Sequence, residues 1–347
     1  MSLFLRALRG EDTPRAPIWI MRQAGRYLSE YRALKAEHGF WTLARTPELA
    51  TEVTLQPVRR FGMDAAILFS DIMTPLPDMG LPLEFRPGPV LDRPVRSAAD
   101  VERLRVPSEE EVAPFVPDAI RLLRRELGDT PLIGFAGAPL TLATYAVQGS
   151  GSKEYELFRG FLRRESATAD ALLEKFTDLT INYLRAQVAA GAQAVQLFDS
   201  WAGIHDLATY ERFGAPAAER VLSALADTGV PRIYIAVGAQ HLYPAIARLP
   251  LEAVSVDWRM PLSACRTALP GLTLQGNLDP AALLGDEASL TAEATAVLRE
   301  GLGGPHVFNL GHGIFKETDP DMVARLVDLV RGYDRHAAMA TTAAGVA

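Results

Sequence analysis

Cysteine is almost absent from this chain of 347 residues, with Cys265 as its one representative. A single thiol excludes an intramolecular disulfide framework and any zinc site built from several thiolates, and it fits a reducing cytoplasm. No apolar run approaches the roughly 18 residues needed to cross a bilayer. The opening residues, MSLFLRALRG, form too short and too charged a stretch for a signal peptide. We therefore expect a cytoplasmic protein with no membrane partner.

Lysine is also scarce. Four of the 35 basic residues are lysines, which leaves 31 arginines against 42 acidic residues and a net charge of −7. That balance argues against a nucleic-acid partner. A GC-rich coding bias can produce the ratio alone, but arginine is also the better partner for carboxylates, because its planar fork binds them bidentately. The positions of the arginines therefore decide between a compositional and a functional explanation.

Short apolar runs recur along the chain and alternate with longer amphipathic stretches, as in parallel strands covered by helices on both faces. Helix starts are predicted by Thr46-Pro47-Glu48 and by cap-then-proline pairs at Asp279 and Asp319. Another helical pattern runs from about Glu154 to Ala190 and ends at Gly191. The predicted strands are 18–21, 65–69, 132–135, 194–197, 233–237, 253–256, 273–275 and 306–309.

Eight strands with intervening helices predict an α/β fold of the (β/α)8 barrel type, as a single domain over residues 1–335. A doubly wound open sheet is the alternative, and a glycine-rich phosphate loop after the first strand would favour it. The sequence there, Arg-Gln-Ala-Gly-Arg, has a single glycine. The proline-rich segment 75–94 predicts an ordered, turn-laden excursion that can form a hairpin, and the tail 336–347 is expected to fray.

Polar and glycine residues cluster where the predicted strands end, and in a barrel these ends form the catalytic face. Arg22 and Arg26 follow the first strand four residues apart. A solvated helix start is the plain interpretation, but clustered cations beside a buried strand need an anion to offset their repulsion, which favours a carboxylate or phosphate site. Asp71 follows the second strand. It is an N-cap candidate, yet the residues after it give no clear helical turn.

Three other side chains stand at later strand ends. Tyr145 fits an ordinary core position as well as a binding site. Ser200 lacks the flanking glycines of a nucleophile elbow. His312 lies between two glycines, which favours a ligand close to the backbone. The six histidines show no metal-ligand spacing, and no phosphate loop, dinucleotide fingerprint or strand-end lysine is present, so we predict a cationic site without metal or cofactor.

Together these segments resemble the uroporphyrinogen decarboxylase family. The resemblance covers nearly the whole chain in 21–27, 69–72, 137–145, 198–203, 274–280 and 309–314. It implies a (β/α)8 homodimer of haem biosynthesis. The implied reaction is the cofactor-free removal of four acetate carboxyl groups from uroporphyrinogen III, a tetrapyrrole, to give coproporphyrinogen III.

The resemblance also implies roles for individual residues. Arg22 and Arg26 would bind substrate carboxylates, and Arg22 would be a candidate proton donor to the reacting pyrrole. Asp71 would accept hydrogen bonds from the pyrrole N–H groups and stabilise positive charge on the ring. Phe198 would belong to an apolar wall. The remaining substrate contacts would be Gln23, Ala24, Gly25, Tyr145, Ser200 and His312.

Two other functions compete with this one. A cobalamin-dependent methyltransferase on the same barrel would bind catalytic zinc through histidine and cysteine, whereas Cys265 stands alone with no His-x-Cys pair. A non-catalytic tetrapyrrole carrier would need the arginines but not Asp71.

Overall fold

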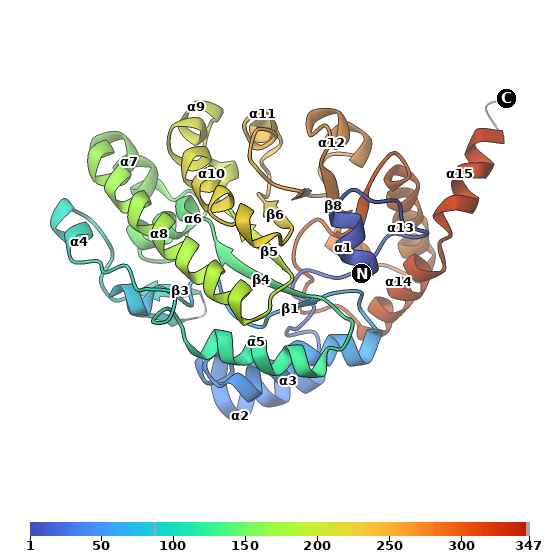
Figure 1. Cartoon of the computed structure of the whole chain (residues 1–347), viewed down its shortest axis with the longest axis horizontal. Coiled ribbons are helices and arrows are strands. Elements are labelled where there is room, and N and C mark those ends of the chain that lie inside the picture. The colour runs from blue at the N-terminus through green and yellow to red at the C-terminus, as the bar shows by residue number, and fades with distance from the viewer. Residues whose placement is uncertain (87, 345–347) are drawn as a thin grey trace.

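The computed structural model describes residues 1–86 and 88–344, and it is built around one curled sheet of parallel strands (Figure 1). Each strand pairs in parallel with the next in chain order. The strands are β1 (Ala66–Ile67), β4 (Leu132–Gly137), β5 (Ala194–Phe198), β6 (Arg232–Ile235), β7 (Ala253–Ser255), β8 (Thr273–Leu278) and β9 (His306–Leu310).

The first predicted strand, 18–21, is reduced to a single parallel bridge between Ile18 and Phe308 of β9. On its other side the Ile18 carbonyl accepts a hydrogen bond from the Asp64 N–H at 2.8 Å, so this segment bridges the gap between β9 and β1. The ladder is interrupted by a proline and by a side chain distant in sequence. Pro17 has no N–H, and the N–H of Ile18 donates instead to the Asp64 carboxylate at 2.8 Å. The predicted α/β barrel is confirmed, with one irregular strand position.

Helices surround the sheet, as Figure 1 shows. They are α1 (Leu3–Leu8), α2 (Ser29–Arg45), α3 (Pro47–Phe61), α4 (Ala98–Glu102), α5 (Phe115–Glu126), α6 (Pro139–Gln148), α7 (Glu156–Arg164), α8 (Ser166–Ala190), α9 (Leu207–Thr209), α10 (Ala215–Ser223), α11 (Tyr243–Ile246), α12 (Leu262–Ala268), α13 (Glu287–Gly301), α14 (Pro320–Gly332) and α15 (Arg335–Ala344).

The predicted helix boundaries hold with one difference. Thr46 precedes α3, and Gly191, with φ of 118°, ends α8. The helical pattern from 154 to 190 is divided into α7 and α8, because Glu165 adopts φ −125° and ψ 45°, outside the helical region. The Asp279 and Asp319 carboxylates each accept a backbone N–H two residues ahead at 2.9 Å, at the start of a 3₁₀ helix and of α14.

The proline-rich segment forms the hairpin that its turn residues predict. Strands β2 (Leu83–Phe85) and β3 (Pro89–Leu91) pair antiparallel outside the barrel. At the other end of the chain, α15 covers most of the segment 336–347, and the last three residues of that segment lie outside the described part.

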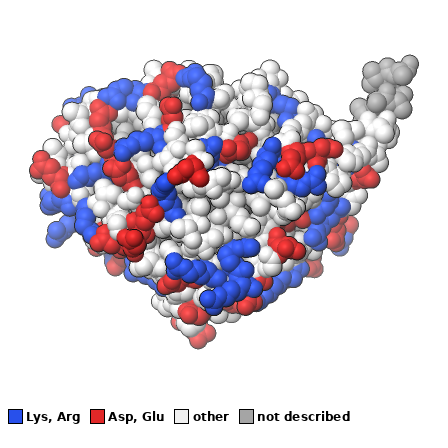
Figure 2. All heavy atoms as spheres, viewed as in Figure 1, with Lys and Arg blue, Asp and Glu red and all other residues white. Residues whose placement is uncertain are grey.

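The barrel interior holds a buried polar chain. The Trp19 indole N–H donates to Gln275 at 2.9 Å, and the Gln275 amide donates to Gln196 at 2.9 Å. Basic and acidic side chains are interspersed over the face shown in Figure 2, with ion pairs among them. Over the described residues, no helix combines the length and apolar character that spanning a membrane requires.

Candidate active site

The loop that follows the first strand position is tied to the loop that follows the last strand. The Met21 N–H donates to Oδ1 of Asn309 at 2.9 Å, and the Ile314 N–H donates to the Met21 carbonyl at 3.0 Å. The buried Gln23 side chain holds the same loop through two hydrogen bonds to the backbone. Its Oε1 accepts the Ile20 N–H and its Nε2 donates to the Ala65 carbonyl, both at 3.1 Å. The backbone that carries the predicted arginines is therefore fixed at both sides.

Arg22 lies against the glycine-flanked loop after β9. Its φ of 65° is unusual for a residue with a side chain. A Cβ built on Gly313 would come within 2.4 Å of the Arg22 Cδ, so the arginine side chain occupies the space that a larger residue at 313 would fill. Glycine at 313 is thus required by the close approach of Arg22.

Asp71 ends the loop after β1 and is half-buried. Its Oδ1 accepts the Met73 N–H at 2.8 Å, and its own N–H donates to the Thr74 hydroxyl at 3.1 Å. Burial raises the pKa of the Asp71 carboxyl, and the Met73 N–H and the positive charge of Arg22 act in the opposite direction. Asp71 is therefore an acidic group in a poorly solvated place, with a cation in electrostatic range.

Tyr145, on α6, completes an aromatic group beside this pair. Its ring centroid lies 5.9 Å from Tyr155 and 6.1 Å from Trp201, and Tyr155 lies 4.4 Å from Trp201. Burial raises the pKa of the Tyr145 phenol, the negative charge of Asp71 raises it further, and Arg22 lowers it. Tyr145 is thus a protonated hydroxyl close to both charged groups.

His312 and Ser200 are half-buried. Burial lowers the pKa of the His312 imidazole, and the positive charge of Arg22 lowers it further, so the ring is neutral at pH 7. The Ser200 hydroxyl, directly after the β5 end, has no hydrogen-bond partner among the described residues. Both side chains can therefore accept a hydrogen bond from a ligand or donate one to it.

Arg26 is placed differently from Arg22. Like Arg22 it is exposed, but its positive charge acts on Tyr31 of α2, whose ring packs edge-on against Phe69 at 5.6 Å. Phe69 leads into the loop of Asp71, so Arg26 stands on the flank of the site next to α2. No hydrogen bond joins its guanidinium to another described residue.

The remaining predicted contacts divide into two kinds. The Gln23 side chain is fully buried with both ends bonded to the backbone, so the structure does not bring it to the open end of the barrel. The N–H groups of Ala24 and Gly25 have no partner among the described residues and remain available as donors. Phe198 is half-buried and packs edge-on against Phe135 at 5.4 Å, as an apolar wall requires.

Two buried carboxylates at strand ends have no predicted role. Asp199 accepts the Thr141 hydroxyl at 2.7 Å and the Tyr234 hydroxyl at 2.6 Å, and burial raises its pKa to about 6. Asp257 binds the Arg259 guanidinium at 2.9 Å. The signal that could have found both is the placement of an acidic residue directly after a buried apolar run.

No group of three or more histidine, cysteine or acidic side chains is arranged to hold a metal ion within 1–86 and 88–344.

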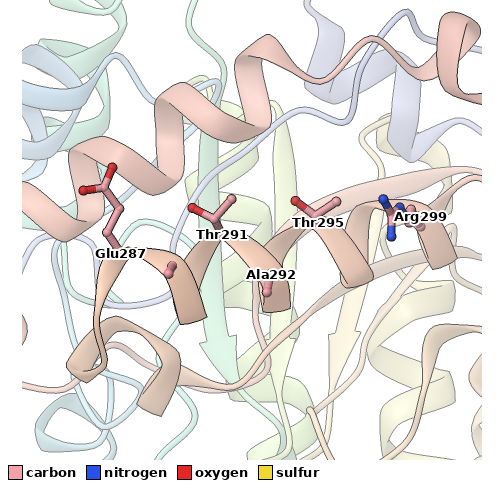
Figure 3. Close-up of a pocket in the computed structure, with 6 residues that line it drawn as sticks. Glu287, Thr291, Ala292, Thr295 and Arg299 are labelled. Carbon is pink, nitrogen blue, oxygen red and sulfur yellow. The ribbon is translucent and has the colours of Figure 1, made fainter.

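A cavity of about 660 Å³ lies on the outer face of α13 instead of at the strand ends (Figure 3). Small side chains and one residue of each charge line it, and it includes none of the predicted site residues. We place the candidate site at the carboxyl end of the barrel, because the loops there bring Arg22 into electrostatic range of Asp71.

Comparison with known proteins shows the family of the chain. The sequence model of the family described as Uroporphyrinogen decarboxylase (URO-D) matches residues 1–333. A uroporphyrinogen decarboxylase of Syntrophotalea carbinolica is 50% identical over 330 residues, which is 94% of this chain and 96% of the relative. One from Salinispora tropica is 47% identical over 333 residues, 95% of this chain and 90% of the relative.

Solved structures share the fold at lower identity. A methyltransferase from Methanosarcina mazei superposes with a TM-score of 0.81 at 22% identity, covering 95% of this chain and 98% of that one. A B12-independent methionine synthase from Shewanella sp. W3-18-1 gives a TM-score of 0.58 at 12% identity, covering 92% and 96%. At these identities the likeness concerns the fold alone.

Proposed function

The chain belongs to the uroporphyrinogen decarboxylase family, and on that premise we propose that the residues around Arg22 and Asp71 bind uroporphyrinogen III and remove its four acetate carboxyl groups. The enzyme is a carboxy-lyase of haem biosynthesis acting on a tetrapyrrole. The observation that carries the site assignment is that the positive charge of Arg22 acts on Asp71, Tyr145 and His312, which come from three other strand-end segments.

The chemistry needs an electron sink, because loss of CO₂ from an acetate side chain otherwise leaves a carbanion. Protonation of the pyrrole ring supplies that sink. Departure of CO₂ then gives a neutral, enamine-like intermediate with an exocyclic methylene. A proton added to the methylene carbon, and loss of the earlier ring proton, complete the methyl group. No cofactor is required for this sequence.

Asp71 accepts hydrogen bonds from the pyrrole N–H groups and stabilises the cationic ring. A carboxylate in a poorly solvated place interacts more strongly with that charge than a fully hydrated one would, and such preorganised groups contribute several kcal/mol. Arg22 holds the reacting side chain's carboxylate and is the candidate proton donor, since it is the cation that acts on Asp71.

The other contacts serve binding. Arg26 takes a second carboxylate on the α2 side of the site. Tyr145, Ser200 and His312 offer uncharged hydrogen-bonding groups, and the free N–H groups of Ala24 and Gly25 offer two backbone donors. We assign Gln23 to positioning the loop, because its amide is bonded to the backbone at both ends.

We further propose that residues 1–335 act as one catalytic domain, in the cytoplasm and as a homodimer. The continuous buried core from Phe4 to Val330 supports the single domain. The homodimer and the compartment rest on the family resemblance.

The methyltransferase alternative needs a thiolate ligand. Cys265 is buried at 0% exposure on α12, and burial raises the pKa of its thiol to about 11, so it stays protonated at pH 7. The donor set of this chain therefore does not fit a zinc site at the strand ends. Stoichiometric zinc in the purified protein would contradict this assignment.

Anaerobic incubation with uroporphyrinogen III, followed by chromatography of the products, tests the function. We expect hepta-, hexa-, penta- and tetracarboxylate products in succession from protein dialysed against chelator. An unchanged octacarboxylate with stoichiometric binding would support the carrier instead.

A further inference from the structure

A third arginine stands at the carboxyl end of the barrel without an assigned role. Arg259 lies in the loop after β7, and its side chain is 48% exposed. Its guanidinium carbon lies 4.2 Å from the centre of the Trp258 ring, so the planar group stacks on an aromatic face. The stacking and an ion pair to Asp257 hold the guanidinium in one orientation.

Asp257 is unusually well satisfied for the partner of an exposed arginine. Its side chain is 1% exposed. Oδ2 accepts the Gly238 N–H at 2.5 Å and Nη1 of Arg259 at 2.9 Å. Oδ1 accepts the Gln240 amide at 2.7 Å and the Arg259 N–H at 2.9 Å. Each oxygen of this carboxylate already accepts two hydrogen bonds, so it holds Arg259 in place instead of binding a ligand.

The opposite edge of that guanidinium is open. Nε and Nη2 of Arg259 have no hydrogen-bond partner among the described residues. A guanidinium presents donors on two edges, so one carboxylate can hold it while a second binds the free edge. Exposed ion pairs contribute little to stability, which leaves the elaborate support of Arg259 unexplained by folding alone.

Arg259 also lies in the same neighbourhood as Arg22. A Cβ on Gly311 would come within 2.5 Å of the Trp258 nitrogen, while one on Gly313 would meet Arg22. The loop 311–313 is thus packed between the two arginine-bearing loops. His312 lies at the centre of this loop. Burial has the largest effect in lowering the pKa of its imidazole, and the positive charges of Arg22 and Arg259 each lower it further.

We propose that Arg259 binds a carboxylate of the tetrapyrrole other than the one at Arg22, through the free edge formed by Nε and Nη2. Arg259 is then a specificity-determining residue that recognises the many carboxylates of the substrate, on the far side of His312 from Arg22. The proposal rests on the proposed site, so its test includes Arg22.

The experiment compares Arg259→Ala, Arg259→Lys, Arg22→Ala and Arg212→Ala. Arg212 is a matched control, because it pairs bidentately with Asp170 and lies 4.6 Å from the Phe213 ring, but in the helical layer. We measure KM and kcat for uroporphyrinogen III at several ionic strengths, together with the midpoint of thermal unfolding.

For Arg259→Ala we expect KM to rise about tenfold, kcat to change by less than about twofold, and the dependence of KM on salt to weaken. Arg259→Lys should recover part of the loss, because it restores the charge but not the fork. Arg212→Ala should match the parent.

An Arg259→Ala protein with the parent's KM and salt dependence would overturn the inference, and so would a lower unfolding midpoint with KM unchanged, which marks a structural role. If Arg22→Ala is impaired while Arg259→Ala is not, only this inference fails. If neither variant changes kcat or KM, the proposed site itself is wrong.

Discussion

At the scale of single residues, the two arginines of the first loop act on different neighbours. The positive charge of Arg22 acts on Asp71, Tyr145 and His312. The positive charge of Arg26 acts on Tyr31 on the flank of the site, where we propose that it binds the periphery of a large substrate. A substitution at each position should therefore affect different kinetic constants.

Arg26→Lys should raise KM for uroporphyrinogen III by about three- to tenfold and leave kcat close to the parent's, because an ammonium replaces a bidentate fork at a binding contact. Steady-state kinetics under anaerobic conditions measures both constants. The control is Arg59→Lys, since Arg59 is also exposed but pairs with Glu52 within α3. An unchanged KM in Arg26→Lys would count against carboxylate binding at this position.

At the scale of elements, the site is built by loops that hold one another. The loop after the first strand position is bonded to Asn309 and Ile314, and the loop after β9 is packed between Arg22 and Trp258. These contacts join segments almost 300 residues apart in sequence, as the 288-residue separation of Met21 and Asn309 shows. The position of Arg22 therefore depends on the glycines of another loop.

Gly313→Ala should lower kcat/KM by about tenfold to a hundredfold, because the new Cβ would lie 2.4 Å from the Arg22 Cδ and displace the guanidinium. Gly151→Ala is the matched control, since a Cβ there meets nothing within 4 Å and no positive φ is involved. Activity and circular dichroism are measured on both. Parent activity in Gly313→Ala would show that Arg22 need not occupy this place.

Much of this architecture could be predicted from local sequence, and the exceptions have a common cause. Apolar runs predicted the strands, and residues such as Gly191 and Asp319 predicted helix boundaries. The irregular first strand was not predictable, because the N–H of Ile18 is taken by Asp64, 46 positions away. Likewise, Gln23 looks like a site residue in sequence, and its bond to Ala65 emerges only when the chain folds.

At the scale of the whole molecule, the buried ionisable groups connect stability to pH. Burial lowers the pKa of His205 and of His306 to about 4, so both are neutral in the folded protein. Between about pH 4 and 6.5 the unfolded chain binds these two protons and the native protein does not, which makes stability fall as the pH falls. Asp199 acts with the opposite sign, because burial raises its pKa to about 6.

The two protons that the histidines bind in the unfolded chain outnumber the one that Asp199 binds in the native protein. We therefore expect the free energy of unfolding to decrease by roughly 1 kcal/mol per pH unit from pH 6 to pH 4.5. His205→Leu should flatten this slope. His205 Nε2 is buried without a partner among the described residues, and its ring packs on Phe158 at 5.8 Å, so leucine suits the site. Urea unfolding at several pH values measures the slope, with a constant m-value as the control. A slope unchanged in His205→Leu would contradict the assignment of this proton.

We propose that Asp71 stabilises the cationic pyrrole in a site whose arginines bind the carboxylates, and Asp71→Asn separates this role from substrate binding. Substrate binding and product formation are measured on the same anaerobic preparation. We predict that the dissociation constant for uroporphyrinogen III stays within about threefold of the parent's, while decarboxylation slows by roughly a hundredfold or more. Decarboxylation at the parent rate would show that Asp71 does not stabilise the cationic pyrrole.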